Sequence, residues 1–191
     1  MINIHKSINE EYYKSSLKLI LDNYEGIKKD LNNVPREYYN IFPQMKDVAQ
    51  YDFGWTLYPI IYKKRVLDFE RFTNFTSSLL MDIGVLNAAF SLFSPKTKTT
   101  LHSGNTPYTY RSHFGLKVPK ECKFLVEDED FTPYEKCITL FPSEFPHIAI
   151  NDSDEDRYIL LIDFLKPNVS INTFFNNKNE SNIKIYDDKH T

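Results

Sequence analysis

The stretch LHSGNTPYTYRSHFGL, from Leu101 to Leu116, holds two of the chain's five histidines and an arginine. Within it, Thr109, Arg111 and His113 stand two residues apart. On a β-strand, side chains at this spacing point to the same face. The spacing therefore predicts a strand with one polar face, which is either exposed to solvent or lines a polar cavity.

Short strand-like runs separated by turn residues continue on both sides of this stretch. They are Asn87–Phe93, Lys98–Leu101, Thr109–Lys117, Cys122–Glu127, Lys136–Phe141, His147–Asn151 and Tyr158–Phe164. Strands this short and this evenly spaced are typical of a sandwich, a barrel or a jelly roll.

Two amphipathic helices are predicted ahead of these strands. Apolar residues recur at helical spacing from Asn9 to about Leu31, and again from Asp68 to Asp82, where Gly84 follows the last turn. The second pattern ends where the strand-like runs begin.

The length of 191 residues suits one domain with decorations. We expect a single domain over residues 1–175, with a helical N-terminal decoration over about 1–50. The polar tail over 176–191 is expected to be poorly ordered.

Charge and composition argue against several classes of partner. The formal net charge is −3 and no Lys/Arg block is present, so no nucleic-acid partner is expected. No apolar run approaches about 18 residues, so we expect no stable membrane insertion and a cytoplasmic location. Cys122 and Cys137 are too few for a disulfide framework or a thiolate metal site.

Two further residues stand out on their own. His147 opens the run HIAIN, and a lone histidine of this kind is more often structural than a metal ligand. Arg157 precedes YILLIDF, an almost unbroken apolar strand. An arginine buried there is costly unless it pairs with an anion.

Taken together, these residues form an ordered set of motifs. The set is H-S-G at 102–104, R-S-H-F-G-L at 111–116, V-P at 118–119, C at 122, F-P-H at 145–147, N at 151, R at 157 and L-L-I-D-F at 160–164. It resembles the aspartyl/asparaginyl β-hydroxylase family, over roughly Trp55 to Pro167. The resemblance implies a mainly β protein with flanking α-helices, on a double-stranded β-helix (jelly roll, cupin-like) fold.

The resemblance also implies an iron(II)- and 2-oxoglutarate-dependent dioxygenase, in which His102 and His147 are the metal ligands. Most enzymes of this chemistry add a carboxylate two residues after the first histidine. Here that residue is Gly104. The family also has glycine there, so the absence of the carboxylate agrees with the resemblance.

The remaining site residues follow from the same resemblance. Arg157 with Ser91 would hold the far carboxylate of 2-oxoglutarate. Arg111 and His113 would line the same cavity, next to the near carboxylate or the substrate. His102, His147, Arg111 and His113 would form the catalytic set, with molecular oxygen as the second cosubstrate.

The sequence departs from the family pattern in two segments. F-P-S-E-F-P-H carries Pro142 and Ser143 where the family usually has an aspartate pair, and Leu165-Lys166-Pro167 replaces W-H-P. An aspartate ahead of His147 could orient that imidazole, and its loss would weaken metal binding unless Glu144 or a backbone carbonyl substitutes for it.

The predicted function is hydroxylation of an unactivated C–H, most simply in an aspartyl/asparaginyl-type amino acid or peptide side chain. One alternative is a non-catalytic jelly-roll protein that binds 2-oxoglutarate or a similar small anion. Others are a lipid A-type fatty acyl hydroxylase and a purely structural interaction domain. The partner is expected to be a small molecule or a peptide, and the sequence leaves the oligomeric state open.

Overall fold

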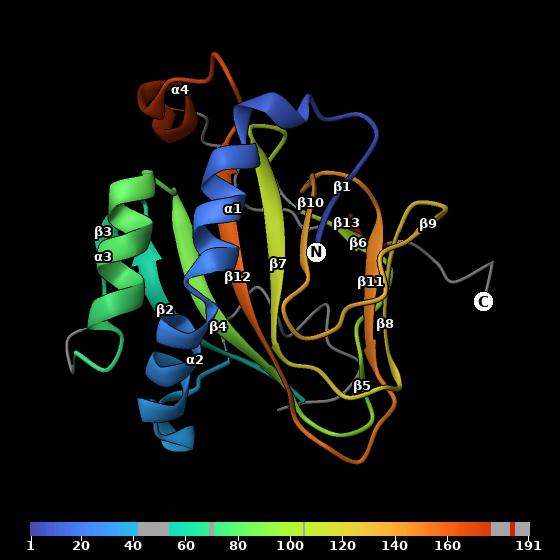
Figure 1. Ribbon diagram of the computed structural model, residues 1–191. Helices are drawn as coiled ribbons and strands as arrows, with labels where there is room; N and C mark the ends of the chain where they lie inside the picture. The colour runs from blue at the N-terminus through green and yellow to red at the C-terminus, as the bar shows by residue number, and fades with distance from the viewer. Residues whose placement is uncertain (42–53, 69–70, 105, 177–183, 186–191) are drawn as a thin grey trace.

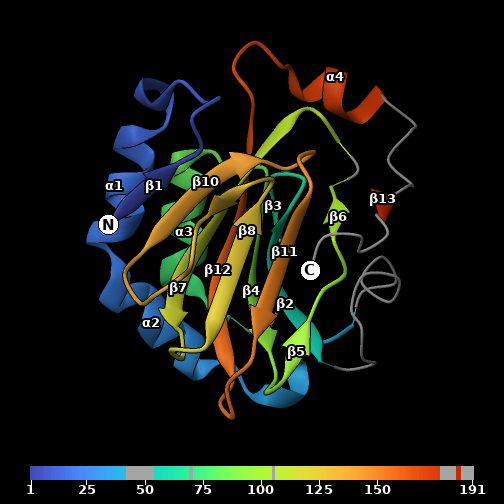
Figure 2. The same cartoon turned by 90° about the vertical axis from the view of Figure 1, so that its right-hand side faces the viewer.

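The computed structural model describes residues 1–41, 54–68, 71–104, 106–176 and 184–185. Two β-sheets face one another, and helices cover the outer face of the larger sheet (Figures 1 and 2). None of the helices in these ranges is long and apolar enough to cross a membrane.

The larger sheet has seven strands, in the order β1-β10-β7-β12-β4-β2-β3. In that order their bounds are Ile2–Ile4, Ile138–Pro142, Thr109–Lys117, Arg157–Leu165, Asn87–Phe93, Trp55–Tyr62 and Arg65–Val66.

The smaller sheet has six strands, with β13-β6-β11-β8-β9 in order and β5 also pairing with β11. Their bounds, from β5 onward along the chain, are Thr97–Lys98 (β5), His102–Ser103 (β6), Cys122–Val126 (β8), Glu129–Asp130 (β9), His147–Asn151 (β11) and Lys184–Ile185 (β13).

From β4 to β12 the chain passes back and forth between the two sheets. Strands β4, β7, β10 and β12 lie in the larger sheet, and β5, β6, β8, β9 and β11 lie in the smaller one. This alternation of antiparallel strands between two facing sheets is the double-stranded β-helix, or jelly roll. The predicted fold class is therefore confirmed, and the flanking helices are present as expected.

The predicted strands Asn87–Phe93, Thr109–Lys117 and His147–Asn151 have the bounds of β4, β7 and β11. The prediction for Lys98–Leu101 was wrong, because β5 ends at Lys98 and β6 begins only at His102. Strand β2 was missed. It contains Pro59, where the pairing with β4 shifts register, and a proline inside a run argues against a strand.

The predicted helix from Asn9 to Leu31 is in fact two helices. A 3-10 turn (Glu10–Tyr12) precedes α1 (Lys14–Asp22), and α2 (Tyr24–Asn33) follows one residue later. At Asn23 the backbone leaves helical geometry (φ −98°, ψ 19°), and its side-chain Nδ2 donates to the Leu19 carbonyl at 2.8 Å. The apolar periodicity continues across this break, which explains why the sequence pattern did not reveal it.

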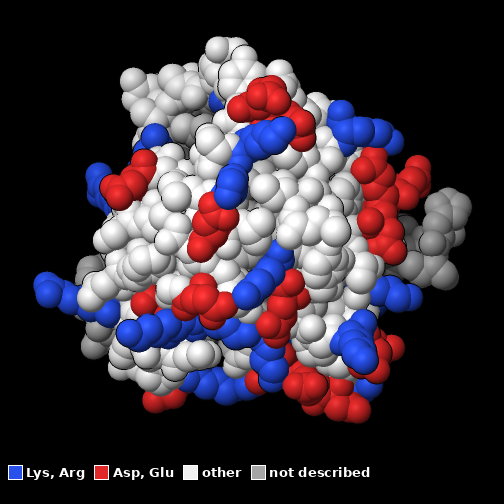
Figure 3. Space-filling view, viewed as in Figure 1, with Lys and Arg blue, Asp and Glu red and all other residues white. Residues whose placement is uncertain are grey.

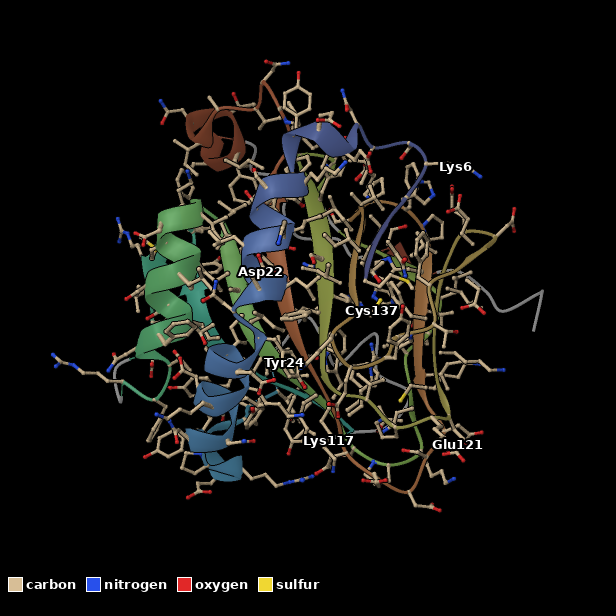
Figure 4. All side chains as sticks on the ribbon, in the orientation of Figure 1. Lys6, Asp22, Tyr24, Lys117, Glu121 and Cys137 are labelled. Carbon is tan, nitrogen blue, oxygen red and sulfur yellow. The ribbon has the colours of Figure 1, made fainter. Side chains whose placement is uncertain are left out.

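The break places Tyr24, the first residue of α2, over the large sheet (Figure 4). Its hydroxyl donates to the Leu116 carbonyl at 3.0 Å. A second 3-10 turn (Arg36–Tyr38) follows α2. The short helix α4 (Ile171–Asn176) follows the last strand of the barrel.

Helix α3 spans Asn74–Ile83 and begins six residues later than predicted. The Asp68 carboxylate instead accepts the backbone N–H groups of Phe72 (3.2 Å) and Thr73 (2.5 Å), which holds a turn ahead of the helix. The predicted end is confirmed, because Gly84 adopts the left-handed conformation (φ 83°) that suits glycine.

The apolar residues form two separate cores. The larger core packs α1, α2 and α3 on the outer face of the large sheet, with Leu17, Ile20 and Phe114 fully buried. The smaller core lies between the sheets and is rich in phenylalanine, with Phe124 and Phe141 among its members. Because this inner core is small, part of the space between the sheets is left to polar side chains.

The predicted poorly ordered tail falls largely outside the described residues, apart from Asn176 and the strand β13. The domain limits drawn from the sequence stay a prediction.

Candidate active site

A pocket opens between the two sheets, and all six site residues predicted from the sequence line it. They are Ser91, His102, Arg111, His113, His147 and Arg157. Thr109, Arg111 and His113 were predicted to share a strand face that is either exposed or lines a cavity. In the structure Arg111 and His113 line the cavity, while Thr109 is buried against Ser143 and is not part of the lining. The opposite face of β7, with Phe114, packs into the larger core.

The two predicted metal ligands, His102 and His147, lie directly opposite one another. They are paired across the antiparallel strands β6 and β11. Their ring centroids are 4.3 Å apart, and both side chains are buried. Two segments far apart in the sequence thus bring two imidazoles together at one point of the pocket.

Both imidazoles are held in the same way. Nδ1 of His102 donates to the Thr100 carbonyl, and Nδ1 of His147 donates to the Phe145 carbonyl, each at 2.8 Å. A carbonyl only accepts, so the tautomer is fixed and each Nε2 keeps its lone pair. No described residue hydrogen-bonds to either Nε2. A backbone carbonyl, that of Phe145, therefore orients His147, and it is one of the two groups named above that could replace the aspartate.

Burial keeps these imidazoles neutral. It lowers the pKa of His102 to about 4 and the pKa of His147 well below its usual range. A neutral imidazole with a free Nε2 is the form that binds a transition metal. Among the described residues no third histidine, cysteine or carboxylate joins the pair.

At Gly104 there is no room for a side chain. Its N–H donates to the Ser143 carbonyl at 2.7 Å, and a Cβ on Gly104 would lie only 2.6 Å from that oxygen. The position at which related chemistry has a carboxylate is thus closed by the backbone of a neighbouring loop.

Arg157 is the most unusual residue of the pocket. Its side chain is 1% exposed, and neither Nε, Nη1 nor Nη2 has a hydrogen-bond partner in the part of the chain that the structure describes. The guanidinium lies 5.3 Å from the centre of the Phe93 ring. Burial lowers its pKa to about 10, so it is still charged at neutral pH. A buried, unpaired cation is costly, and a carboxylate ligand would satisfy it.

Ser91 lies on β4, one strand away from Arg157. Its hydroxyl oxygen accepts the indole N–H of Trp55 at 2.9 Å. Because the indole can only donate, the Ser91 hydroxyl hydrogen is left to donate to something else. Trp55 was not singled out from the sequence, and only the pairing of β2 with β4 brings it to the pocket.

Arg111 has a different environment. Its Nε and Nη2 donate to the two carboxylate oxygens of Asp163 at 2.8 and 3.1 Å. Asn87 Nδ2 also donates to Asp163, at 3.1 Å. Asp163 was missed in the sequence, although it shares the even spacing that puts Arg157 on the pocket face of β12.

His113 completes the pocket between aromatic rings. It packs against Phe124 and Phe141, with ring centroids 4.3 and 5.2 Å away. Burial, and then the charge of Arg157, hold the pKa of His113 well below its usual range. Its Nδ1 is buried and makes no hydrogen bond within the described residues.

The chain is similar to several known proteins. Aspartate beta-hydroxylase domain-containing protein 2 of Mus musculus is 36% identical over 87 residues, which is 44% of this chain and 25% of that protein. The ornithine lipid ester-linked acyl 2-hydroxylase of Rhizobium tropici is 31% identical over 96 residues, 49% of this chain and 34% of that protein. The matched regions therefore span at most about a third of these relatives.

Among solved structures, the Cupin_2 domain of an XRE family transcriptional regulator from Enterobacter cloacae has a TM-score of 0.41 and 12% identity, covering 58% of this chain and 96% of that one. Residues 21–167, most of the chain and all six predicted site residues, match the family described as Aspartyl/Asparaginyl beta-hydroxylase. The protein is a member of the aspartyl/asparaginyl β-hydroxylase family.

Proposed function

We propose that this hydroxylase-family protein uses iron(II), 2-oxoglutarate and molecular oxygen to hydroxylate an unactivated C–H. One observation carries the proposal: a buried and unpaired guanidinium, Arg157, shares a pocket with two neutral imidazoles whose hydrogen bonds to described residues use Nδ1 and leave Nε2 available. Such a pocket can take a metal and an anion together.

His102 and His147 would hold the metal. Two neutral nitrogen donors suit Fe(II), and they leave its other positions to cosubstrate, oxygen and solvent. When bound, the iron would activate molecular oxygen, which is the oxidant, with 2-oxoglutarate as the co-reductant, and the protein would supply binding and orientation. Gly104 has no side chain and would add no metal ligand to the two histidines.

The arginines and the serine would hold the cosubstrate. The free guanidinium of Arg157 and the available hydroxyl hydrogen of Ser91 are suited to a carboxylate. Arg111 and His113 lie in the same pocket and would face the near carboxylate or the substrate. Phe124 and Trp55 line the same pocket and would help to exclude water from it.

The substrate class follows from the family. We propose an aspartyl- or asparaginyl-type side chain, free or in a peptide, since the family is described by that activity. The second candidate is a fatty acyl chain of a lipid, which is favoured by the similarity to the Rhizobium tropici acyl 2-hydroxylase. A cytoplasmic location stays part of the proposal.

Two measurements test the function. The chain has a single tryptophan, Trp55, which lines the pocket, so its fluorescence should report the binding of 2-oxoglutarate. We expect binding that requires a divalent metal, and release of succinate under air with Fe(II) that disappears in His102→Ala. No metal binding together with no succinate would refute the proposal.

The same measurements separate the alternatives. Binding of 2-oxoglutarate without any oxygen consumption, across peptide and lipid substrates, would identify a non-catalytic anion-binding protein. Stimulation of succinate release by acyl lipids but not by aspartyl peptides would favour the second candidate.

A further inference from the structure

One short loop contacts the segments that carry both histidines. This support loop, Ser143–Pro146, joins β10 to β11. The Ser143 carbonyl accepts the N–H of Gly104 at 2.7 Å, two residues after His102. The Phe145 carbonyl accepts Nδ1 of His147 at 2.8 Å. A shift of this loop would therefore misplace the imidazole of His147 and the segment next to His102.

Two residues of the support loop, Ser143 and Phe145, are held by contacts of their own side chains. The hydroxyl group of Ser143 lies 2.8 Å from the Thr109 hydroxyl and 3.0 Å from the Thr106 carbonyl. The ring of Phe145 packs edge-on against His5, with centroids 5.2 Å apart. Between Ser143 and Phe145 in the chain lies Glu144.

Glu144 instead forms an ion pair with Lys166, which follows the last strand of the barrel. Lys166 Nζ lies 2.5 Å from Glu144 Oε1, and the two side chains are only 20% and 28% exposed. The backbone of Lys166 is fixed by its N–H bond to the Tyr108 carbonyl at 2.9 Å. Its ammonium lies 4.9 Å from the centre of the Tyr110 ring. A largely buried pair of this kind is screened less than a surface pair.

We propose that Glu144 and Lys166 are positioning residues that hold the support loop and, through the Phe145 carbonyl, aim Nε2 of His147 into the pocket. The metal-binding part of this inference rests on the proposed function. The orientation of the His147 ring does not, because its hydrogen bond to Phe145 exists without a metal.

Titration with Co(II), followed by its visible absorption under anaerobic conditions, tests the metal-binding part. Glu144→Gln and Lys166→Met should each weaken Co(II) binding by about 10-fold, the lower end of the range for residues that orient metal ligands. The doubly exchanged protein, Glu144→Lys with Lys166→Glu, should recover most of that loss.

A matched ion pair away from the pocket provides the control. Opposite charges lie side by side on the face of the molecule that carries α1 and α2 (Figure 3). One such pair joins Lys28 of α2 to Glu135, with Nζ and Oε2 2.8 Å apart. Glu135→Gln removes a comparable pair and should leave Co(II) binding within twofold of the original protein.

A second readout needs no metal. In protein labelled with ¹⁵N in its histidine rings, the Nδ1–H proton of His147 should exchange with water several-fold faster in Glu144→Gln. The Nδ1–H proton of His102, held by Thr100, should exchange at an unchanged rate. A positioning role predicts this selective change, whereas a general loss of stability would affect both protons.

The outcomes separate the two proposals. If the original protein binds Co(II) and 2-oxoglutarate, but Glu144→Gln changes neither Co(II) affinity nor His147 exchange, the positioning role is wrong and the proposed function stands. If the original protein binds no metal, the proposed function fails, and the His147 exchange rate alone decides the role of the pair.

Discussion

The two ends of the pocket are built differently, although both rest on one face of β12. At one end Arg157 is buried with no partner among the described residues, while at the other end Asp163 pairs with Arg111 and Asn87. Positions 157 and 163 are roughly 20 Å apart along a strand that rises about 3.3 Å per residue. One end thus has an uncompensated charge that suits an incoming anion, and the other is neutral before any ligand arrives.

Removing the unpaired charge should have the largest effect. In Arg157→Met, the affinity for 2-oxoglutarate should fall by about 30-fold or more, because truncating one partner of a buried charged hydrogen bond costs about 2–5 kcal/mol. The ligand-free protein should at the same time become more stable, by about 1–3 kcal/mol, because a buried cation without a partner is lost. Calorimetric titration and urea unfolding measure the two changes. Unchanged affinity would mean that the anion binds elsewhere.

Breaking the ion pair between Arg111 and Asp163 should lower the stability of the protein, whereas Arg157→Met should raise it. In Asp163→Asn, Arg111 keeps its charge but loses its counter-charge, and the pair is only partly exposed (28% and 11%). The free energy of unfolding should fall by about 2 kcal/mol. The affinity for 2-oxoglutarate should change less than in Arg157→Met. If the two variants shift stability in the same direction, the contrast between the two ends is wrong.

One half of this contrast, the unpaired arginine, was available from the sequence, and strand alternation also predicted which residues share a face. The shared polar face of Thr109, Arg111 and His113 was predicted from their spacing. The need of Arg157 for an anion was predicted from its place at the start of an apolar strand. The family resemblance then grouped His102 with His147. What brings these residues to one pocket is the pairing of β6 with β11 and of β7 with β12.

Asp163 was missed as a site residue, and the pairing of Glu144 with Lys166 was not predicted, because these roles arise only through contacts between strands or loops. Asp163 looks like one polar residue in an apolar strand until Arg111 is paired opposite to it. Glu144 and Lys166 belong to the two segments that depart from the family pattern, and the fold joins the two departures in one ion pair. A pattern along the chain does not contain such long-range pairings.

The buried histidines of the pocket should make the metal-free protein sensitive to acid. Burial lowers the pKa of His102 from 6.5 to about 4 in the folded state. Between these two pH values the unfolded chain binds a proton at His102 and the folded chain does not. Stability is complete above pH 6.5 and is lost as the pH falls towards about 4, by about 1.4 kcal/mol per pH unit for each such imidazole.

Urea unfolding at several pH values, with a chelator present, measures this loss. His102→Gln removes one of the imidazoles and should give a shallower dependence on pH. If the free energy of unfolding depends on pH equally steeply in the original protein and in His102→Gln, then His102 is not held neutral in the folded state.

The smallest effect is expected from replacing Asn87, which hydrogen-bonds to Asp163 at the neutral end of the pocket. Asn87 donates to Asp163 through Nδ2 and accepts the N–H of Lys63 at 2.9 Å through Oδ1, so it links the carboxylate to the turn between β2 and β3. Asn87→Ala should lower the free energy of unfolding by about 1 kcal/mol, the usual value of such hydrogen bonds. The affinity for 2-oxoglutarate should stay within twofold, because Arg111 keeps both bonds to Asp163.

A double-mutant cycle of Asn87→Ala with Asp163→Asn, followed by urea unfolding, tests whether the two residues act as one unit. If Asn87 acts on the neutral end only through Asp163, part of its effect should disappear once Asp163 is replaced. The part that remains then belongs to its bond with Lys63. Strictly additive effects would mean that Asn87 stabilises the turn and contributes nothing to the neutrality of this end of the pocket.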